Sequence, residues 1–98
     1  MRTLMKILIP VEAGSKALQD GNLPKLIAEI TEQIKPEAAY FFPTEGKRSC
    51  FMVFDLNDSS DLPAITESVF QHLQAHIEIT PCMNLEDLQN GMMKMSHH

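Results

Sequence analysis

Three residues with side chains able to carry a proton, Lys6, Tyr40 and Glu78, occur inside short apolar segments of this 98-residue chain. Lys6 interrupts an apolar run near the N-terminus, and Glu78 alternates with two isoleucines in the second half of the chain. When a lysine or a glutamate is buried beside a tyrosine, its pKa moves toward neutrality, which suits proton transfer. We therefore predict Lys6, Tyr40 and Glu78 as candidate catalytic residues. The alternative is that Lys6 and Glu78 form a satisfied polar pair within an interface.

Two groups of residues have the side chains that bind metal ions, but neither has the required spacing. His72 and His76 are four residues apart, as two ligands on one face of a helix would be. The strand predicted to begin at His76 separates them, however, and no third ligand is suitably spaced. Asp55, Asp58 and Asp61 surround a polar loop, but a hard cation needs more oxygen ligands than these, and Asp61 is expected to cap a helix. We predict surface histidines, a solvated loop and no metal site.

The remaining reactive side chains are not part of a catalytic motif. Gly14-Ser15-Lys16 follows the first apolar segment, as a phosphate-binding loop would, but the rest of that motif is absent and a flexible loop is predicted. Cys50 and Cys82 lack metal-ligand spacing, and both are expected to be buried thiols without a disulfide. No cofactor is predicted.

The composition excludes several classes of partner. Eight Lys and Arg residues against thirteen Asp and Glu give a formal charge of −5, which argues against binding to nucleic acid or to an anionic membrane. A single domain over residues 1–98 is expected, with 93–98 as a frayed tail. Lys6 and Pro10 interrupt and end the first apolar segment, so it is not typical of an export signal, and no segment is long enough to span a bilayer. A cytoplasmic protein is predicted.

Apolar runs and turn residues predict the strands that position these side chains. Strands are expected at 4–11, 38–43, 49–56 and 76–82. The middle two are joined by a short hairpin at Glu45, Gly46 and Lys47, where the glycine is free to adopt a positive φ. After the first strand, residues 12–16 have the composition of a loop, and 17–21 are ambiguous, with room for one helical turn.

Three helices are predicted from apolar periodicity and capping residues. The first follows an N-cap at Asn22 and ends at Pro36, the second is capped by Asp61, and a short terminal helix is capped by Asn84 and runs toward Met92. The order is therefore β-α-β-β-α-β with a terminal helix. This is the ferredoxin-like plan, an α+β fold in which both helices cover one face of a four-stranded antiparallel sheet.

The third predicted strand is apolar on both faces. Cys50, Met52 and Phe54 lie on one face, and Phe51 and Val53 lie on the other. Two helices cover only one face, and soluble monomers seldom expose a large apolar patch. We therefore predict a homodimer, or a multiple of dimers, with the sheets packed face to face or joined at their edges into a barrel. The alternative is that the terminal helix folds back across the open face.

Two stretches in the second half of the chain carry a resemblance to a known family. They are Phe51-Met52-Val53-Phe54-Asp55-Leu56 and, after a polar turn and a helix, His76-Ile77-Glu78-Ile79. Their order resembles the strand, helix and final strand of muconolactone isomerases, in the dimeric α+β barrel superfamily that also includes small antibiotic-biosynthesis monooxygenases. The resemblance implies a dimeric α+β barrel with a pocket between sheet and helices. No catalytic position of the isomerases matches a residue here, so their activity is not implied.

The leading functional prediction is a homodimer that binds a small, largely apolar molecule in the pocket between sheet and helices. The predicted contacts are Tyr40, Phe42, Phe51, Val53 and His76. An alternative, which relies on the resemblance, is a cofactor-free isomerase or monooxygenase that pairs Tyr40 with Lys6 or Glu78. A third is a structural or protein-interaction module with a solid barrel. The first two require a cavity and the third excludes one.

Overall fold

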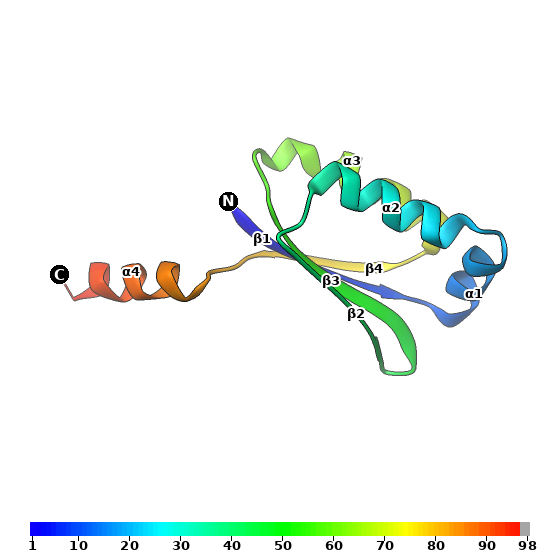
Figure 1. The fold of residues 1–98 in the computed structure, drawn as a ribbon, viewed down its shortest axis with the longest axis horizontal. Helices are drawn as coiled ribbons and strands as arrows, with labels where there is room; N and C mark the ends of the chain where they lie inside the picture. The colour runs from blue at the N-terminus through cyan, green and yellow to red at the C-terminus, as the bar shows by residue number, and fades with distance from the viewer. Residues whose placement is uncertain (97–98) are drawn as a thin grey trace.

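The computed structural model describes residues 1–96, in which a four-stranded sheet is combined with four α-helices (Figure 1). The elements in chain order are β1 (Arg2–Ile9), α1 (Val11–Gln19), α2 (Asn22–Ile34), β2 (Ala38–Thr44), β3 (Lys47–Asp55), the 3₁₀ turn η1 (Ser59–Asp61), α3 (Leu62–Leu73), β4 (His76–Pro81) and α4 (Leu85–Met95). Every predicted strand and helix is present. The order is β-α-α-β-β-α-β-α, with α1 as an additional helix.

Neighbouring strands of the sheet all run antiparallel, in the order β2-β3-β1-β4. The predicted α+β fold with a four-stranded antiparallel sheet is therefore confirmed, and β2 and β4 form its edges. The two-residue turn between β2 and β3 uses positive φ values at Glu45 (53°) and Gly46 (73°), as a tight hairpin requires. Because this turn pairs Thr44 with Lys47, it fixes which residues of β2 lie opposite β3.

One face of the sheet carries the core, because α2 and α3 pack across it (Figure 1). Alternate residues of the central strands point toward these helices and are buried, namely Thr3, Met5, Ile7 and Ile9 on β1 and Cys50, Met52 and Phe54 on β3. The helices contribute Leu23, Leu26, Ile30 and Ile34 from α2 and Ile65, Val69 and Leu73 from α3. Full burial of one large apolar side chain stabilises a fold by about 1.5–3 kcal/mol.

Helix α1 replaces the loop that was predicted at 12–16, and the first strand ends at Ile9 rather than at Val11. Pro10 has extended backbone angles (φ −55°, ψ 141°) and stands at the N-cap of α1, so strand and helix adjoin without a loop. Gly14 gave this segment its loop-like composition. In the structure it is a buried helical residue, and a Cβ there would lie only 3.0 Å from Ile9 Cγ2.

Of the first two predicted helix caps, Asn22 is wrong and Asp61 is right in position only. Gly21, with φ 78°, is the N-cap of α2, and Asn22 is already inside that helix. Asp61 stands at the N-cap of α3, as predicted, but its side chain makes no capping hydrogen bond. The side-chain cap belongs to the 3₁₀ turn that precedes α3. The carboxylate of Asp58 accepts a hydrogen bond from the backbone N–H of Ser60 at 2.9 Å.

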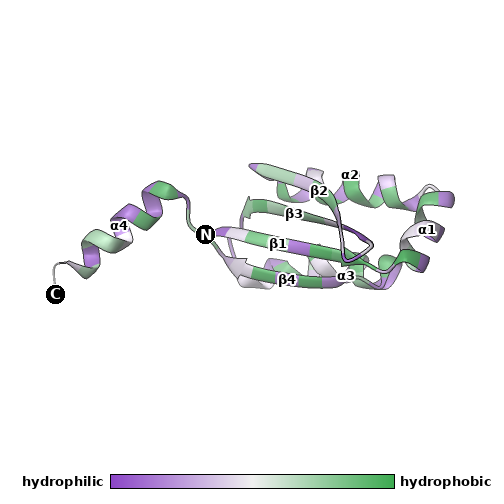
Figure 2. Cartoon of the chain, turned by 90° about the horizontal axis from the view of Figure 1, so that it is seen from below, coloured by the Kyte–Doolittle hydropathy of each residue, from purple (hydrophilic) through white to green (hydrophobic). Residues whose placement is uncertain are grey.

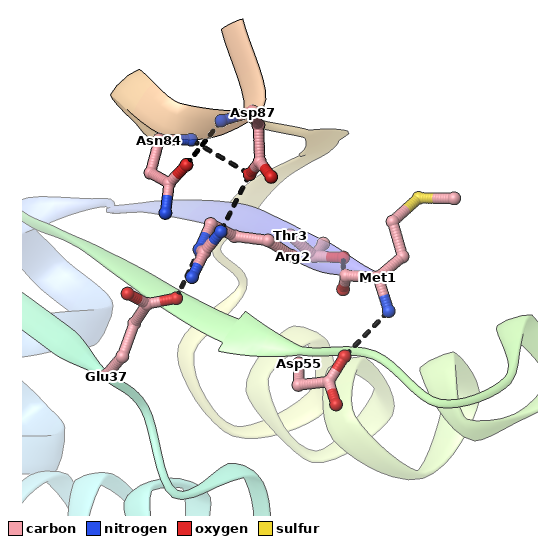
Figure 3. Close-up of polar contacts among 7 residues, drawn as sticks. All are labelled: Met1, Arg2, Thr3, Glu37, Asp55, Asn84 and Asp87. Atoms are coloured by element: carbon pink, nitrogen blue, oxygen red, sulfur yellow. Dashed lines mark hydrogen bonds and ion pairs between the residues drawn. The ribbon is translucent and has the colours of Figure 1, made fainter. Parts of the chain in front are cut away.

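The cap of α4 is as predicted. The Asn84 side chain accepts a hydrogen bond from the Asp87 N–H at 2.8 Å, and the Asp87 carboxylate accepts one from the Asn84 N–H at 3.2 Å (Figure 3). This reciprocal cap stabilises the first turn of the helix, which continues to Met95, beyond the Met92 toward which it was predicted to run. Fraying of the tail stays a prediction, and its last two residues, 97–98, lie outside the described residues.

Helix α4 projects away from the sheet, so it does not fold back over the uncovered face as the alternative proposed (Figure 1). Arg2 connects it to the domain, because its guanidinium donates to Asp87 at 2.8 Å and to Glu37 at 2.6 Å (Figure 3). The apolar residues of α4 are exposed, with Leu85 at 69% and Met95 at 72%. Within residues 1–96, no helix is both long enough and apolar enough to cross a membrane.

Candidate functional site

The face of the sheet opposite α2 and α3 is called the open face here, and it carries the predicted catalytic residues. Strand register places Lys6 beside Glu78 on one side and beside Phe51 on the other, with Tyr40 next to Phe51. Directly paired residues of antiparallel strands point to the same side of the sheet. Glu78, Lys6, Phe51 and Tyr40 therefore form one row across all four strands, and the predicted adjacency of Lys6 and Glu78 is confirmed.

Over β1, β2 and β3 the open face is mainly apolar, whereas β4 presents His76, Glu78 and Thr80 there. Seen from this side, β1 and β3 are hydrophobic along much of their length, with a hydrophilic break within β1 (Figure 2). The apolar members are Leu4 and Leu8 on β1, Phe51 and Val53 on β3, and Ala38, Tyr40 and Phe42 on β2. Phe51 packs against both aromatic neighbours, with ring centroids 5.4 Å from Tyr40 and 5.4 Å from Phe42. Tyr40 is still 60% exposed, so in a single chain this cluster faces solvent.

Lys6 and Glu78 lie side by side on the open face, but no ion pair joins them in the described part of the chain. Lys6 and Glu78 are both exposed, and the ion pairs found within residues 1–96 involve only the N-terminal amine and Arg2 as cations. Proton transfer by such groups needs removal from water, which a single chain does not provide on this face. The predicted roles of Lys6, Tyr40 and Glu78 therefore stay predictions that depend on a cover.

The histidines are separate and exposed. His76 begins β4 opposite Leu8 and lies on the open face, whereas His72 lies in α3 with its Nδ1 2.8 Å from the Ser68 carbonyl. In the described part of the chain, no three His, Cys, Asp or Glu residues are grouped closely enough to hold a metal ion.

A cavity of about 370 Å³ lies on the other side of the sheet, between the strands and α2 and α3. Apolar side chains make up nearly all of its lining. They are Ile7, Ile9, Leu23, Leu26, Ile27, Ile30, Phe41, Phe42, Pro43, Cys50, Met52, Val69 and Leu73, joined by the polar residues Arg48 and Ser49. It forms because β2 extends past the cover of the helices, which leaves Phe41 55% exposed on the helix-facing side.

All five predicted contact residues lie on the open face by strand register. Phe42 also borders the cavity, whereas Tyr40, Phe51, Val53 and His76 are outside its lining. A pocket between sheet and helices was predicted and is present. The residues predicted to serve it lie on the far side of the sheet, and of these five only Phe42 borders the cavity.

Arg48 is the functional candidate that sequence reasoning missed. It is half-buried at the cavity wall, and its Nη1 donates a hydrogen bond to the Ser15 Oγ at 3.3 Å. The signal was present in the alternation of β3, since Arg48 precedes Cys50 and Met52 by two and four residues and so shares their helix-facing side. Arg48 was not predicted because it directly follows the polar hairpin turn and the third strand was expected to begin only at Ser49.

The two cysteines are free, and only Cys50 is fully buried, whereas Cys82 is half-buried. Burial raises the pKa of the Cys50 thiol to about 11. The thiol is therefore protonated at neutral pH and acts as an apolar part of the cavity wall, because nucleophilic attack requires the thiolate.

Comparison of the sequence with models of known protein families and with curated proteins gave no match. The fold and the candidate site therefore define the structural class of the protein. It is an α+β domain with a four-stranded antiparallel sheet, with an apolar cavity under its helices and an apolar open face on the other side. The resemblance to the dimeric α+β barrel superfamily stays a prediction.

Proposed function

We propose that the protein is a homodimer that binds a small, largely apolar molecule in the cavity between the sheet and helices α2 and α3. The observation that carries this proposal is the cavity itself. Its volume of about 370 Å³ lies in the range of small-molecule sites, and all but two of its lining residues are apolar. A cavity of this kind favours binding over the alternative of a solid structural module.

The open face and helix α4 support the dimer. The open face has an aromatic and aliphatic centre, and α4 exposes Leu85, Leu88 and Met92. Exposed apolar patches of this extent mark interfaces in soluble proteins. In this proposal the chain is a ferredoxin-like unit of a dimeric α+β barrel, with α4 packing on the partner subunit.

The charges on the open face favour a second copy of this chain as the occupant. Lys6 and Glu78 lie side by side, so a copy related by a two-fold axis presents the same pair in reverse order. Each Lys6 then approaches the partner subunit's Glu78. The opposite charges leave this central pair with no net charge, so two identical faces can stack without repulsion between like charges.

The enzyme alternative rests on the row Glu78–Lys6–Phe51–Tyr40. Stacking of two sheets would remove Lys6 and Glu78 from water beside Tyr40, as a cofactor-free isomerase or monooxygenase requires. That row and the cavity lie on opposite faces of the sheet, so the reaction would take place between the two sheets. The binding function is therefore proposed first and the enzymatic one second.

Binding in the cavity is tested with N-phenyl-1-naphthylamine, an uncharged apolar probe whose fluorescence increases on leaving water. Ile27 is half-buried in the cavity lining, whereas its neighbour Ala28 is exposed and outside it. Ile27→Trp should narrow the cavity and weaken probe binding about tenfold or more, and Ala28→Trp should leave it unchanged. Circular dichroism checks that both variants fold. Equal binding by the wild type and Ile27→Trp would remove the cavity as the site.

A further inference from the structure

Among the described residues, the cavity lining includes one charged residue, Arg48. Its position on β3 is opposite Ile9 of β1 and Pro43 of β2, on the helix-facing side near the end of the sheet that carries the hairpin. All other cavity-lining residues are apolar, apart from Ser49, whose hydroxyl already donates to the Phe42 carbonyl. The cavity surface is therefore apolar, and the Arg48 guanidinium lies at its α1 end, beside Ser15.

Helix α1 holds the Arg48 side chain in place. The guanidinium donates to Ser15 at 3.3 Å, and the chain lies across Gly14, where a Cβ would be 3.1 Å from Nη1 and 3.4 Å from Cδ. Glycine at this position leaves the space that the arginine occupies. The segment that sequence analysis predicted as a flexible loop is thus a helix that positions the cation.

Within residues 1–96, most of the hydrogen-bonding capacity of Arg48 is unused by the protein. A guanidinium has five N–H donors arranged as a planar fork, and in this part of the chain only the bond to Ser15 uses one of them. Arg2, the other arginine, is paired with both Glu37 and Asp87 (Figure 3). Within residues 1–96, by contrast, no carboxylate lies within ion-pair distance of Arg48.

We propose that the molecule bound in the cavity is a small amphipathic carboxylic acid, with its carboxylate on Arg48 and its apolar body among Leu26, Ile30 and Leu73. This inference depends on the proposed function, because it names the class of ligand for the same cavity. A planar carboxylate matches the guanidinium fork. A single cation in an apolar wall balances one negative charge, which favours a carboxylate over a doubly charged phosphate.

The test compares octanoate with 1-octanol, which have the same chain length and differ in charge, by isothermal titration calorimetry at pH 7. The wild type should bind octanoate about tenfold or more tightly than octanol, since charge-assisted hydrogen bonds are the stronger kind. Arg48→Met should lose this preference and bind the two equally, with octanol affinity unchanged. Arg2→Met, which removes the other arginine, should behave as the wild type.

A second variant tests the positioning of Arg48 without removing it. In Gly14→Ala, the new methyl group would lie 3.0 Å from Ile9 Cγ2 and 3.1 Å from Arg48 Nη1, so octanoate should lose severalfold more affinity than octanol. Arg48→Lys keeps the charge but loses the planar fork of donors, and should retain part of the preference for the acid.

A second pair of ligands, 3-phenylpropanoate with 3-phenylpropan-1-ol, shows whether the bound acid has a flexible or an aromatic body. Selectivity for the acid in either pair supports the proposal.

The outcomes separate this inference from the proposed function. If the wild type binds neither member of either pair, the cavity is not a ligand site and both proposals fail. If it binds the acid and the alcohol equally, and Arg48→Met changes nothing, the ligand class is wrong while the apolar site stands. If Arg48→Met does not fold, the wild-type preference and Gly14→Ala still decide the question.

Discussion

The two faces of one sheet differ sharply, although the same strands form both. Met52 points to the helices and is 1% exposed, while its neighbour Phe51 points the other way and is only partly buried. On β1, Met5 and Lys6 show the same contrast across one peptide bond. One face is closed by α2 and α3, and the other is apolar without a cover in residues 1–96.

The comparison shows that apolar composition alone does not define a core. Residues of the covered face gain stability within one chain, because their surface leaves water on folding. In the proposed dimer, residues such as Phe51 and Val53 gain comparable stability when the partner subunit covers them. An aromatic cluster without a cover is therefore better explained by assembly than by folding, and substitutions on the two faces should have different effects.

The largest expected effect comes from neighbouring substitutions on opposite faces. Met52→Ala leaves a hole in the core and should lower the free energy of unfolding by about 2–5 kcal/mol. Phe51→Ala should instead weaken the dependence of the unfolding midpoint on protein concentration, because it removes contacts between subunits. Urea denaturation at several protein concentrations measures both. A concentration dependence unaffected by Phe51→Ala would mean that the open face is not an interface.

A smaller effect tests whether the covered face is dry. The pKa of the Cys50 thiol is raised to about 11 by burial, so the folded protein holds this proton more tightly than the unfolded chain, whose thiols ionise near pH 9. The resulting stability is fully present below about pH 9 and is lost as the pH rises toward 11. We expect a loss of up to about 2 kcal/mol from this group.

Cys50→Ala separates this loss from other alkaline titrations. Under reducing conditions, the difference in stability between the wild type and Cys50→Ala should shrink between about pH 9 and 11. Cys82→Ala, at the half-buried cysteine, should keep the wild-type pH dependence. A wild-type advantage that stays constant across this pH range would show that Cys50 is accessible to water.

Much of the fold follows from local rules that operate within one element. Alternation assigned Met5 and Ile7 to the helix side, and three-and-four periodicity located α2 with its stop before Pro36. Helix α1 was not predicted because Gly14 was interpreted as a loop residue. Its actual role is to allow a close contact with Ile9, and composition does not reveal such a tertiary contact. The cap at Asn22 failed because α2 begins one residue earlier, after Gly21. Asp61 was correctly placed before α3, but the side-chain cap is made by Asp58 in the preceding 3₁₀ turn.

The candidate site was predictable only in part. Lys6 and Glu78 could be paired from the sequence because β1 and β4 are neighbours in the predicted sheet, and the register agrees. The cavity wall could not be derived in the same way. It depends on how far β2 extends beyond α2, and on the crossing of Arg48 over α1, neither of which is encoded in one strand.

Native mass spectrometry of tag-free protein tests the central claim most directly, since it asks what covers the open face. We predict a mass of twice 11.0 kDa, or a multiple of it, with any retained ligand as an added mass. Leu8→Asp, on the open face, should give the monomer mass, while Leu18→Asp, on the surface of α1, should stay dimeric. A wild type that is monomeric at every concentration would contradict the account.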